Sequence, residues 1–199
     1  GLMGESGSGK STLAKLLIGL EKPSQGQVLL DGQPYSVKKS GVRILLVFQD
    51  SLHSVNPHFT VEQVLTEALP KDVAREEIEA ILEDVGLDKS YLTQPARQLS
   101  GGQLQRICIA RGLLLKPDVL IFDEALSGLD PIVQGRLLRL LYDLWEKYQL
   151  TYLFISHDFK LSYALCHRIL VMADGEIVDE IKDFELPIQA HHPVTKKLI

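Results

Sequence analysis

The feature that most constrains this chain is the segment Gly4–Thr12, GESGSGKST, which fills every fixed position of the phosphate-binding pattern G-x-x-x-x-G-K-[ST]. A polyphosphate needs several backbone N–H groups aimed at it from one side, and the glycines of this segment allow the positive φ angles and the close approach that this requires. Lys10 would place its ammonium on the β- and γ-phosphates, and Ser11 would place its hydroxyl on Mg²⁺. The segment therefore predicts a nucleotide site. The expected contacts are Gly4, Glu5, Ser6, Gly7, Ser8, Gly9, Lys10, Ser11 and Thr12.

The apolar run Leu13–Ile18 directly after the loop predicts a helix, whose N-terminus would add a partial positive charge beside the phosphates. The alternative is a Gly- and Ser-rich turn that precedes a helix by chance, and the complete motif argues against it. A loop of this kind normally follows a buried parallel strand, whereas only residues 1–3 precede it here. We therefore expect the N-terminal strands of the domain to be absent from this sequence.

Composition narrows the class of protein. The length of 199 residues suits one domain with an inserted lobe, and the net charge of −5 argues against a nucleic-acid partner, which usually meets a basic face. No run approaches the roughly 18 apolar residues of a membrane span, and no signal peptide is visible. Cys108 and Cys166 lie in apolar helical patterns and are expected to be reduced thiols. These features are typical of a cytosolic chain.

A second group of candidate residues follows two apolar strands. The run Val119–Phe122 ends in Asp123 and Glu124, and a buried strand that delivers acids at its carboxyl end suits a Mg²⁺-nucleotide site. Asp123 would hold the metal, and Glu124 would orient and activate the attacking water. The alternative is a strand that ends in a solvated acidic turn. His157 lies just past the predicted strand 152–156, where a core histidine would not be expected.

Local signals predict the other elements. Thr60 caps a helix, Gly86 follows the end of another, and Asp130 with Pro131 begins a third. The expected strands are Gly26–Gly32, Val42–Phe48, Arg168–Met172 and Glu176–Ile181, and the expected helices are Val61–Ala68, Lys71–Val85 and a long one from Asp130 to Tyr148. The loop 51–59 holds His53 and His58, for which a solvated position is favoured over a metal site.

Leu99–Gln103, LSGGQ, opens another predicted helix and is either a second anion cradle or an ordinary serine cap with a flexible glycine pair. Together with the phosphate loop, Gln49, Phe122–Glu124, Ser127–Asp130 and His157, this motif resembles the ATP-binding cassette ATPases. The resemblance spans nearly the whole chain in the family's order.

The resemblance implies an α/β fold of the P-loop NTPase type, with a mostly parallel core sheet, a small antiparallel β part and an inserted helical lobe. The chain, 1–199, would be a single domain that lacks its N-terminal part. Its phosphate loop and β part would lie in 1–50, the helical lobe with the signature motif in 51–116, and the rest of the RecA-like core in 117–199. Two ATP molecules would lie in a head-to-tail dimer, each held by the loop of one subunit and the signature of the other. The implied second-subunit contacts are Ser100, Gly101, Gly102 and Gln103, with Asp130 in the dimer-facing loop. Gln49 would sense Mg²⁺ and couple to a membrane partner, and His157 would contact the γ-phosphate.

A finer resemblance concerns the segments 48–57 and 192–195, which are similar to the ATPases of the oligopeptide, dipeptide and nickel importers. Ser51 and Val55 are most similar to the nickel and metal-chelate branch. This similarity implies an ATPase at the cytoplasmic face of the membrane, paired with a paralogous ATPase subunit and with permease subunits. A solute-binding protein would be an indirect partner.

Other classes of protein share the phosphate loop. The cassette proteins that act on ribosomes usually carry two cassettes in one chain, and the DNA-repair group separates loop and signature by long coiled coils. Here about ninety residues without heptads separate them. A nucleotide kinase has no use for the signature. An import ATPase is the favoured prediction, with a non-transport cassette ATPase as the alternative.

Overall fold

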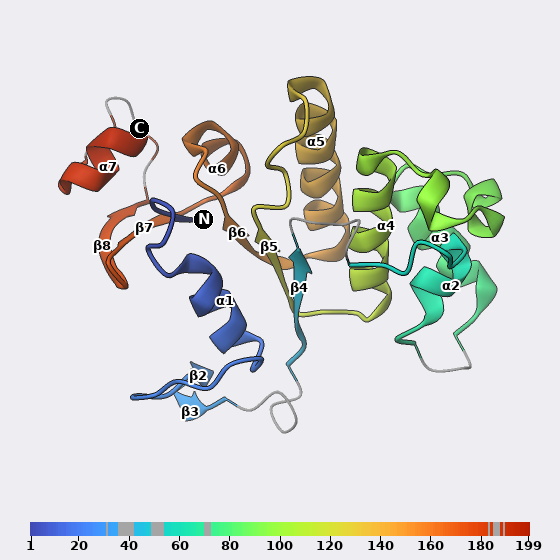
Figure 1. The fold of residues 1–199 in the computed structure, drawn as a ribbon. Helices are drawn as coiled ribbons and strands as arrows, with labels where there is room; N and C mark the ends of the chain where they lie inside the picture. The colour runs from blue at the N-terminus through green and yellow to red at the C-terminus, as the bar shows by residue number, and fades with distance from the viewer. Residues whose placement is uncertain are drawn as a thin grey trace. The chain divides into compact units, whose positions relative to one another are not determined.

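The computed structural model describes residues 1–30, 32–35, 42–48, 54–69, 73–182, 184, 188 and 190–199. The chain forms two compact units. The first, called the core unit here, comprises Gly1–Leu46, Asp118–Glu124 and Thr151–Ile199. The second, the helical unit, comprises Val47–Pro117 and Ala125–Leu150. Figure 1 shows the elements of both, and each unit is described by itself.

The core unit is built on a six-stranded sheet with the order β4-β5-β6-β1-β7-β8. Its strands are β1 (Leu2–Met3), β4 (Ile44–Phe48), β5 (Val119–Asp123), β6 (Thr151–Ile155), β7 (Ile169–Ala173) and β8 (Glu176–Ile181). β1 runs parallel to β6 and β7, β5 runs parallel to β6, and β8 closes the edge as the antiparallel arm of a hairpin. The short strands β2 (Leu29–Leu30) and β3 (Gln33–Pro34) form a separate antiparallel pair. The expected mostly parallel α/β fold with a small antiparallel part is confirmed.

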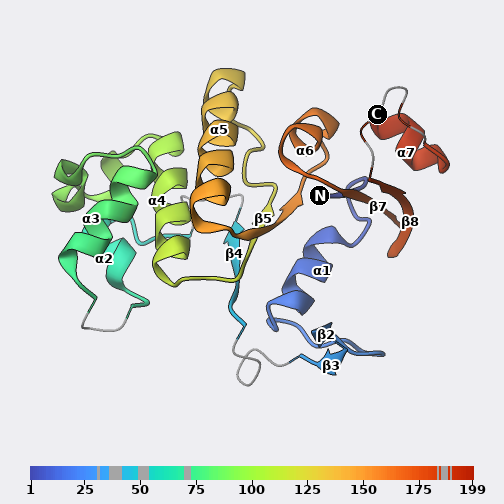
Figure 2. The same cartoon turned by 180° about the vertical axis from the view of Figure 1, so that it is seen from behind.

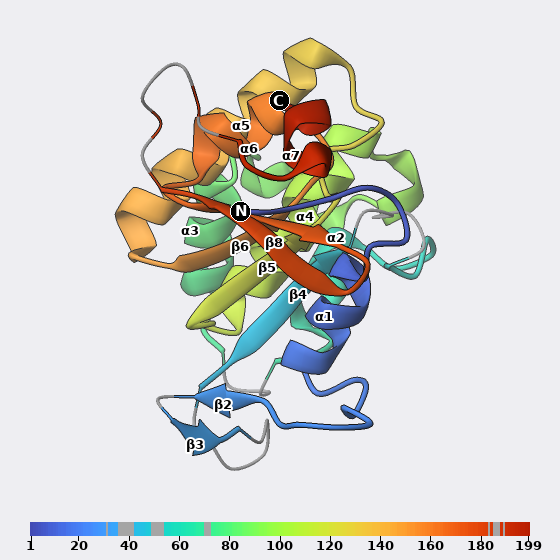
Figure 3. The same cartoon turned by 90° about the vertical axis from the view of Figure 1, so that its left-hand side faces the viewer.

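β1 is short but central, and its two residues serve opposite faces of the sheet. Successive side chains of a strand point to opposite sides. Leu2 packs in a buried cluster with Ala14 of helix α1 (Lys10–Leu17), whereas Met3 packs in a second cluster with residues of β7 and β8. Phe159 of α6 (Phe159–Leu165) and Leu198 of α7 (Pro193–Leu198) cover that second cluster. Figures 2 and 3 show α1 on one side of this sheet and α6 and α7 on the other.

The helical unit is organised around the buried helix α4 (Gly101–Leu114), against which α2 (Val61–Thr66) and α3 (Arg75–Asp84) both pack. The 3-10 turns η1 (Lys89–Thr93) and η2 (Ala96–Gln98) lead into α4, and α5 (Pro131–Tyr148) completes the unit. Lys147 Nζ lies 2.6 and 2.7 Å from the carboxylate oxygens of Asp84, which also accepts a hydrogen bond from the Tyr148 hydroxyl. None of the described helices has the length and apolar character needed to cross a membrane.

Several elements differ from the sequence-based expectation. α3 begins at Arg75 rather than at Lys71, because Ala74 adopts an extended ψ of 140° and Glu76 and Glu77 form the first turn, where acidic side chains favour the helix dipole. Lys71 itself lies outside the described residues. The expected strand 26–32 is reduced to β2, since Gly26 has a φ of +74° that ends extended structure.

Two short helices have no counterpart in the prediction. α6 has 7 residues and α7 has 6, which is too few for an apolar period to emerge from the sequence. Asp158 caps α6 by accepting hydrogen bonds from Lys160 N and Leu161 N. Cys166 therefore lies at the end of α6 rather than inside a helix, and both cysteines are free thiols whose pKa values are raised by burial.

Candidate functional site

The phosphate loop connects β1 to α1 and is shaped by glycine. Gly7 and Gly9 have φ values of +83° and +105°, and Gly9 is the N-cap residue of α1. A Cβ atom on Gly4 would lie 2.2 Å from the backbone oxygen of Met172 in β7. Ser8 O accepts a hydrogen bond of 3.1 Å from Gly175 N in the β7–β8 turn. The loop is thus held against β7 and its turn by backbone contacts that leave no room for a side chain at Gly4.

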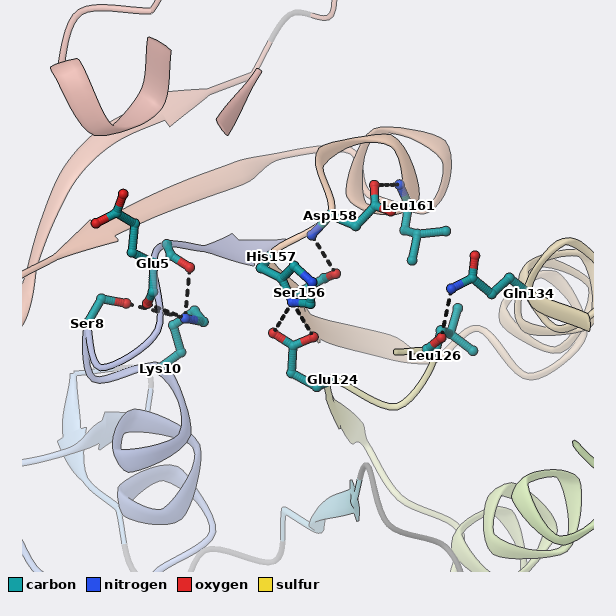
Figure 4. Close-up of polar contacts among 11 residues, drawn as sticks. Glu5, Ser8, Lys10, Glu124, Leu126, Gln134, Ser156, His157, Asp158 and Leu161 are labelled. Carbon is teal, nitrogen blue, oxygen red and sulfur yellow. Dashed lines mark hydrogen bonds and ion pairs between the residues drawn. The ribbon is translucent and has the colours of Figure 1, made fainter. Parts of the chain in front are cut away.

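Lys10 is the buried cation of this loop, with 8% of its surface exposed. Its Nζ donates hydrogen bonds to Gly4 O at 2.9 Å, to Glu5 O at 2.8 Å and to Ser8 Oγ at 3.4 Å, as Figure 4 shows. All three acceptors are neutral, so no carboxylate among the described contacts cancels the ammonium charge. A buried charge without a counter-ion is expensive, and an anionic ligand would relieve it. The loop therefore suits a polyphosphate.

Replacing Gly4 by alanine is expected to destabilise the protein by about 2–4 kcal/mol, because the added methyl group overlaps a backbone oxygen that cannot rotate away. The measurement is the midpoint of thermal unfolding without nucleotide. Gly7→Ala is the matched control: it also has a positive φ, but its Cβ would meet nothing within 4 Å, so only the backbone strain of about 1–2 kcal/mol remains. Equal midpoints for the two variants would contradict the steric argument.

Asp123 is the last residue of β5 and is directly opposite Ile155 in β6. Its Oδ1 is buried and has no hydrogen-bond partner among the described residues. Leaving a buried carboxylate oxygen unpaired is unfavourable, and oxygen ligands of this type are the ones that Mg²⁺ prefers. Ser11, in the first turn of α1, offers an exposed hydroxyl as a second oxygen ligand. These two residues of the core unit therefore fit the predicted Mg²⁺.

Glu124 and His157 form a pair at the ends of neighbouring strands. His157 Nδ1 lies 3.0 and 2.9 Å from the two carboxylate oxygens of Glu124 and donates to them (Figure 4). The β5–β6 register brings them together, and Glu124 N continues the ladder with a 3.0 Å bond to Ile155 O. Glu124 has a φ of +52°, a left-handed conformation that is unfavourable for this residue type and is enriched at functional sites. The side chains are 19% (Glu124) and 64% (His157) exposed, so water reaches the pair.

In the helical unit, the signature segment forms a closed capping box at the start of α4. Ser100 Oγ accepts from Gln103 N at 3.3 Å, and Gln103 Oε1 accepts from Ser100 N at 2.8 Å. Gln103 Nε2 donates to Tyr91 OH at 2.9 Å, which fixes the amide orientation. Tyr91 is a supporting residue that the sequence did not reveal, because it lies in the irregular η1 turn and carries no motif.

The two glycines of the signature differ in their surroundings. A Cβ on Gly101 would meet nothing within 4 Å, whereas one on Gly102 would lie 3.1 Å from Val133 Cγ1 of α5. Gly102 therefore packs closely against α5, whereas Gly101 faces open space. Asp130 caps α5 by accepting from Ile132 N and Val133 N, both at 3.1 Å, as its position before Pro131 predicts.

The structure thus places the predicted residues in two groups. The phosphate loop, Asp123, Glu124 and His157 lie at the ends of β1, β5 and β6 of one sheet, and Glu124 and His157 are in direct contact. The signature residues and Asp130 belong to the helical unit. Gln49, together with Ser51 and His53, lies outside the described residues. The individual roles of these residues remain predictions.

Comparison with known proteins gives consistent results. The family described as "ABC transporter" matches residues 1–127. The nickel import ATP-binding protein NikE of Escherichia coli is 43% identical over 190 residues, which cover 89% of this chain and 71% of that protein. The metal-staphylopine import system ATP-binding protein CntF of Staphylococcus aureus is 40% identical over 205 residues, covering 100% of this chain and 82% of that protein.

Solved structures show the same fold. The structure of cbiO1 from Clostridium perfringens, described as part of the ABC transporter complex cbiONQ, has a TM-score of 0.80 and 29% identity and covers 90% of this chain and 74% of that one. A dimeric ATP-binding cassette in a post-hydrolysis state, bound to ADP and Pi, has a TM-score of 0.74 and 27% identity, with coverages of 91% and 83%.

Proposed function

This chain belongs to the ABC transporter family, and from that membership we propose that it is the ATP-hydrolysing subunit of a membrane importer for nickel or other metal chelates. Two relatives support the solute class, since one is named for nickel import and the other for metal-staphylopine import. Short peptides are the second solute class that the sequence resemblance allows. The relatives named here are import proteins, which disfavours a translation-factor or DNA-repair role.

The observation that carries the proposal is that the phosphate loop and the Glu124–His157 pair both follow strands of the same sheet. The loop N–H groups and Lys10 hold the β- and γ-phosphates of ATP. Ser11 and Asp123, with Gln49 by resemblance, would hold Mg²⁺, which neutralises charge on the phosphate oxygens when bound. The orphaned Oδ1 of Asp123 supports that assignment.

In the proposed reaction, water attacks the γ-phosphorus, the bond to the bridging oxygen breaks, and ADP leaves with the electron pair. Glu124 accepts the proton of the attacking water. His157 restrains the Glu124 carboxylate through its Nδ1–H. It thereby keeps the Glu124 side chain in one orientation. A base that is already oriented loses less entropy in the reaction and so accelerates it.

We further propose a head-to-tail dimer with a second, paralogous ATPase subunit. Gly101 faces open space at the N-terminus of a 14-residue helix, and such a terminus suits an anion. The dimeric neighbour with bound ADP and Pi supports a dimer, and the neighbour that is part of the ABC transporter complex cbiONQ supports partners in a transporter complex. The chain would then be a peripheral protein at the cytoplasmic face of the cell membrane, and a solute-binding protein would act on the opposite side of that membrane.

The proposed solute is tested in the source organism by replacing the gene with a Lys10→Ala version and measuring uptake of radioactive nickel. Loss of the buried ammonium should reduce accumulation to the energy-independent background. Lys160→Ala, which removes an exposed lysine of α6, is the matched control and should retain uptake. Uptake of a labelled dipeptide is measured in parallel. If dipeptide uptake is lost and nickel uptake is kept, the chain serves a peptide importer instead; if both are kept, it powers neither.

A further inference from the structure

The residues 190–199 carry no catalytic pattern, yet they are firmly attached to the core unit. The carboxylate of Asp179 in β8 accepts hydrogen bonds of 2.9 Å from both His191 N and His192 N. His192 Nδ1 in turn accepts from Val194 N and caps α7. Although the burial of Asp179 alone would raise its pKa, the hydrogen bonds from the two backbone N–H groups hold the pKa below its usual value. We call this contact between the Asp179 carboxylate and the backbone N–H groups of His191 and His192 the Asp179 clamp. Because its pKa is lowered, the carboxylate is ionised at neutral pH and the clamp is intact.

α7 packs against β7, which is the neighbour of the strand that leads into the phosphate loop. Val194 and Leu198 pack against the buried cluster that contains Met3 and residues of β7 and β8. Met3 is directly followed by Gly4, the first residue of the loop. Figure 3 shows α7 on the same side of the sheet as α6. α7 is thus held at two points, by the Asp179 clamp and by its apolar face.

This attachment brings Lys197 to the phosphate loop. Lys197 Nζ lies 2.5 Å from Glu5 Oε1, and the two residues are 192 positions apart in the chain. Glu5 is a part of the loop, since its backbone oxygen accepts a hydrogen bond from Lys10. Its carboxylate adds a negative charge to the loop that is expected to bind a polyphosphate, although the side chain itself points toward Lys197 rather than toward Lys10. The hydrogen bond and the charge of Lys197 hold the pKa of Glu5 below its ordinary value, so the carboxylate is ionised at neutral pH.

We propose that Lys197 is a positioning residue of the nucleotide site, which compensates and restrains the Glu5 carboxylate so that the C-terminal helix forms part of the phosphate-binding apparatus. The inference rests on the proposed function in one respect, namely that the loop binds ATP. Because the pair is exposed, at 74% for Lys197 and 47% for Glu5, the effect is modest and sensitive to salt.

The test measures the dissociation constant of ATP by calorimetry on the purified full-length chain. At low ionic strength, Lys197→Ala should weaken ATP binding by about two- to fivefold, and the difference should disappear near 0.5 M salt. Lys196→Ala is the matched control, because Lys196 is an exposed lysine of the same helix without an ion pair among the described residues. It should bind ATP like the parent protein.

Rescue distinguishes the electrostatic role from a structural one. Adding Glu5→Gln to Lys197→Ala should restore the affinity, since the uncompensated carboxylate is then gone, and Lys197→Arg should retain it. Failure of the rescue, or equal affinities for Lys196→Ala and Lys197→Ala, would overturn the proposal. Lys10→Ala is measured alongside: if that variant binds ATP normally, the loop is not the nucleotide site and the proposed function fails instead. Thermal unfolding midpoints verify that each variant is folded.

Discussion

Replacing Glu124 by glutamine is expected to lower the rate of ATP hydrolysis by roughly 10²–10⁴-fold, the usual contribution of a positioned general base, while ATP binding is retained. Glutamine has nearly the same shape and can occupy the same space beside His157, but it cannot accept the proton of the attacking water. The phosphate loop, which supplies the binding contacts, is unchanged. The loss should therefore fall on turnover and not on affinity.

The measurement combines single-turnover hydrolysis with ATP titration in the assembled complex. Glu176→Gln makes the same chemical change at an exposed residue of β8 and should hydrolyse ATP at the parent rate. If the Glu124→Gln protein keeps a near-normal rate, Glu124 is not the base. A lowered affinity together with a lowered rate would instead indicate that the carboxylate contributes to binding.

The second large effect is expected for Ser100→Arg, which should weaken nucleotide binding at the partner subunit's loop by roughly 10- to 100-fold. The substitution removes the hydroxyl that caps α4 and adds a bulky side chain at the exposed end of that helix. The Lys10 site of the same chain should continue to bind nucleotide, because its contacts all come from the core unit.

Photo-crosslinking of labelled ATP to each subunit of the assembled complex separates the two sites. Ser90→Arg introduces the same side chain at another exposed serine of the helical unit and should leave both labels unchanged. If Ser100→Arg abolishes only the label on its own chain, the signature acts on its own loop, and the head-to-tail arrangement is wrong.

Elements defined by local signals were predictable. α5 begins at Pro131, directly after its cap Asp130, and ends at Tyr148, as expected, because cap, first-turn proline and apolar period are all local to this segment. Thr60 caps its helix as predicted, and both Thr60 and Ser100 form capping boxes with a glutamine three residues later. β7 and β8, which correspond to two of the predicted strands, pair as an antiparallel hairpin.

Two short helices were missed although each has a cap residue, because they are too short to show an apolar period. α6 and α7 are stabilised mainly by contacts with distant residues: the apolar cluster around Met3 packs against both, and the Asp179 clamp holds α7. The left-handed backbone of Glu124 also has no sequence signature, since glycine or asparagine would be the usual residue there.

The sequence alone determined the phosphate loop, because nine consecutive residues carry both the glycine conformations and the lysine that a polyphosphate requires. It also placed Asp123, Glu124 and His157 at the ends of strands, since apolar runs and their ends are local features. Only the tertiary structure paired Glu124 with His157, which are 33 residues apart, and Lys197 with Glu5. Those contacts depend on strand register and on the packing of α7, and both arise from the burial of side chains that are distant in the sequence.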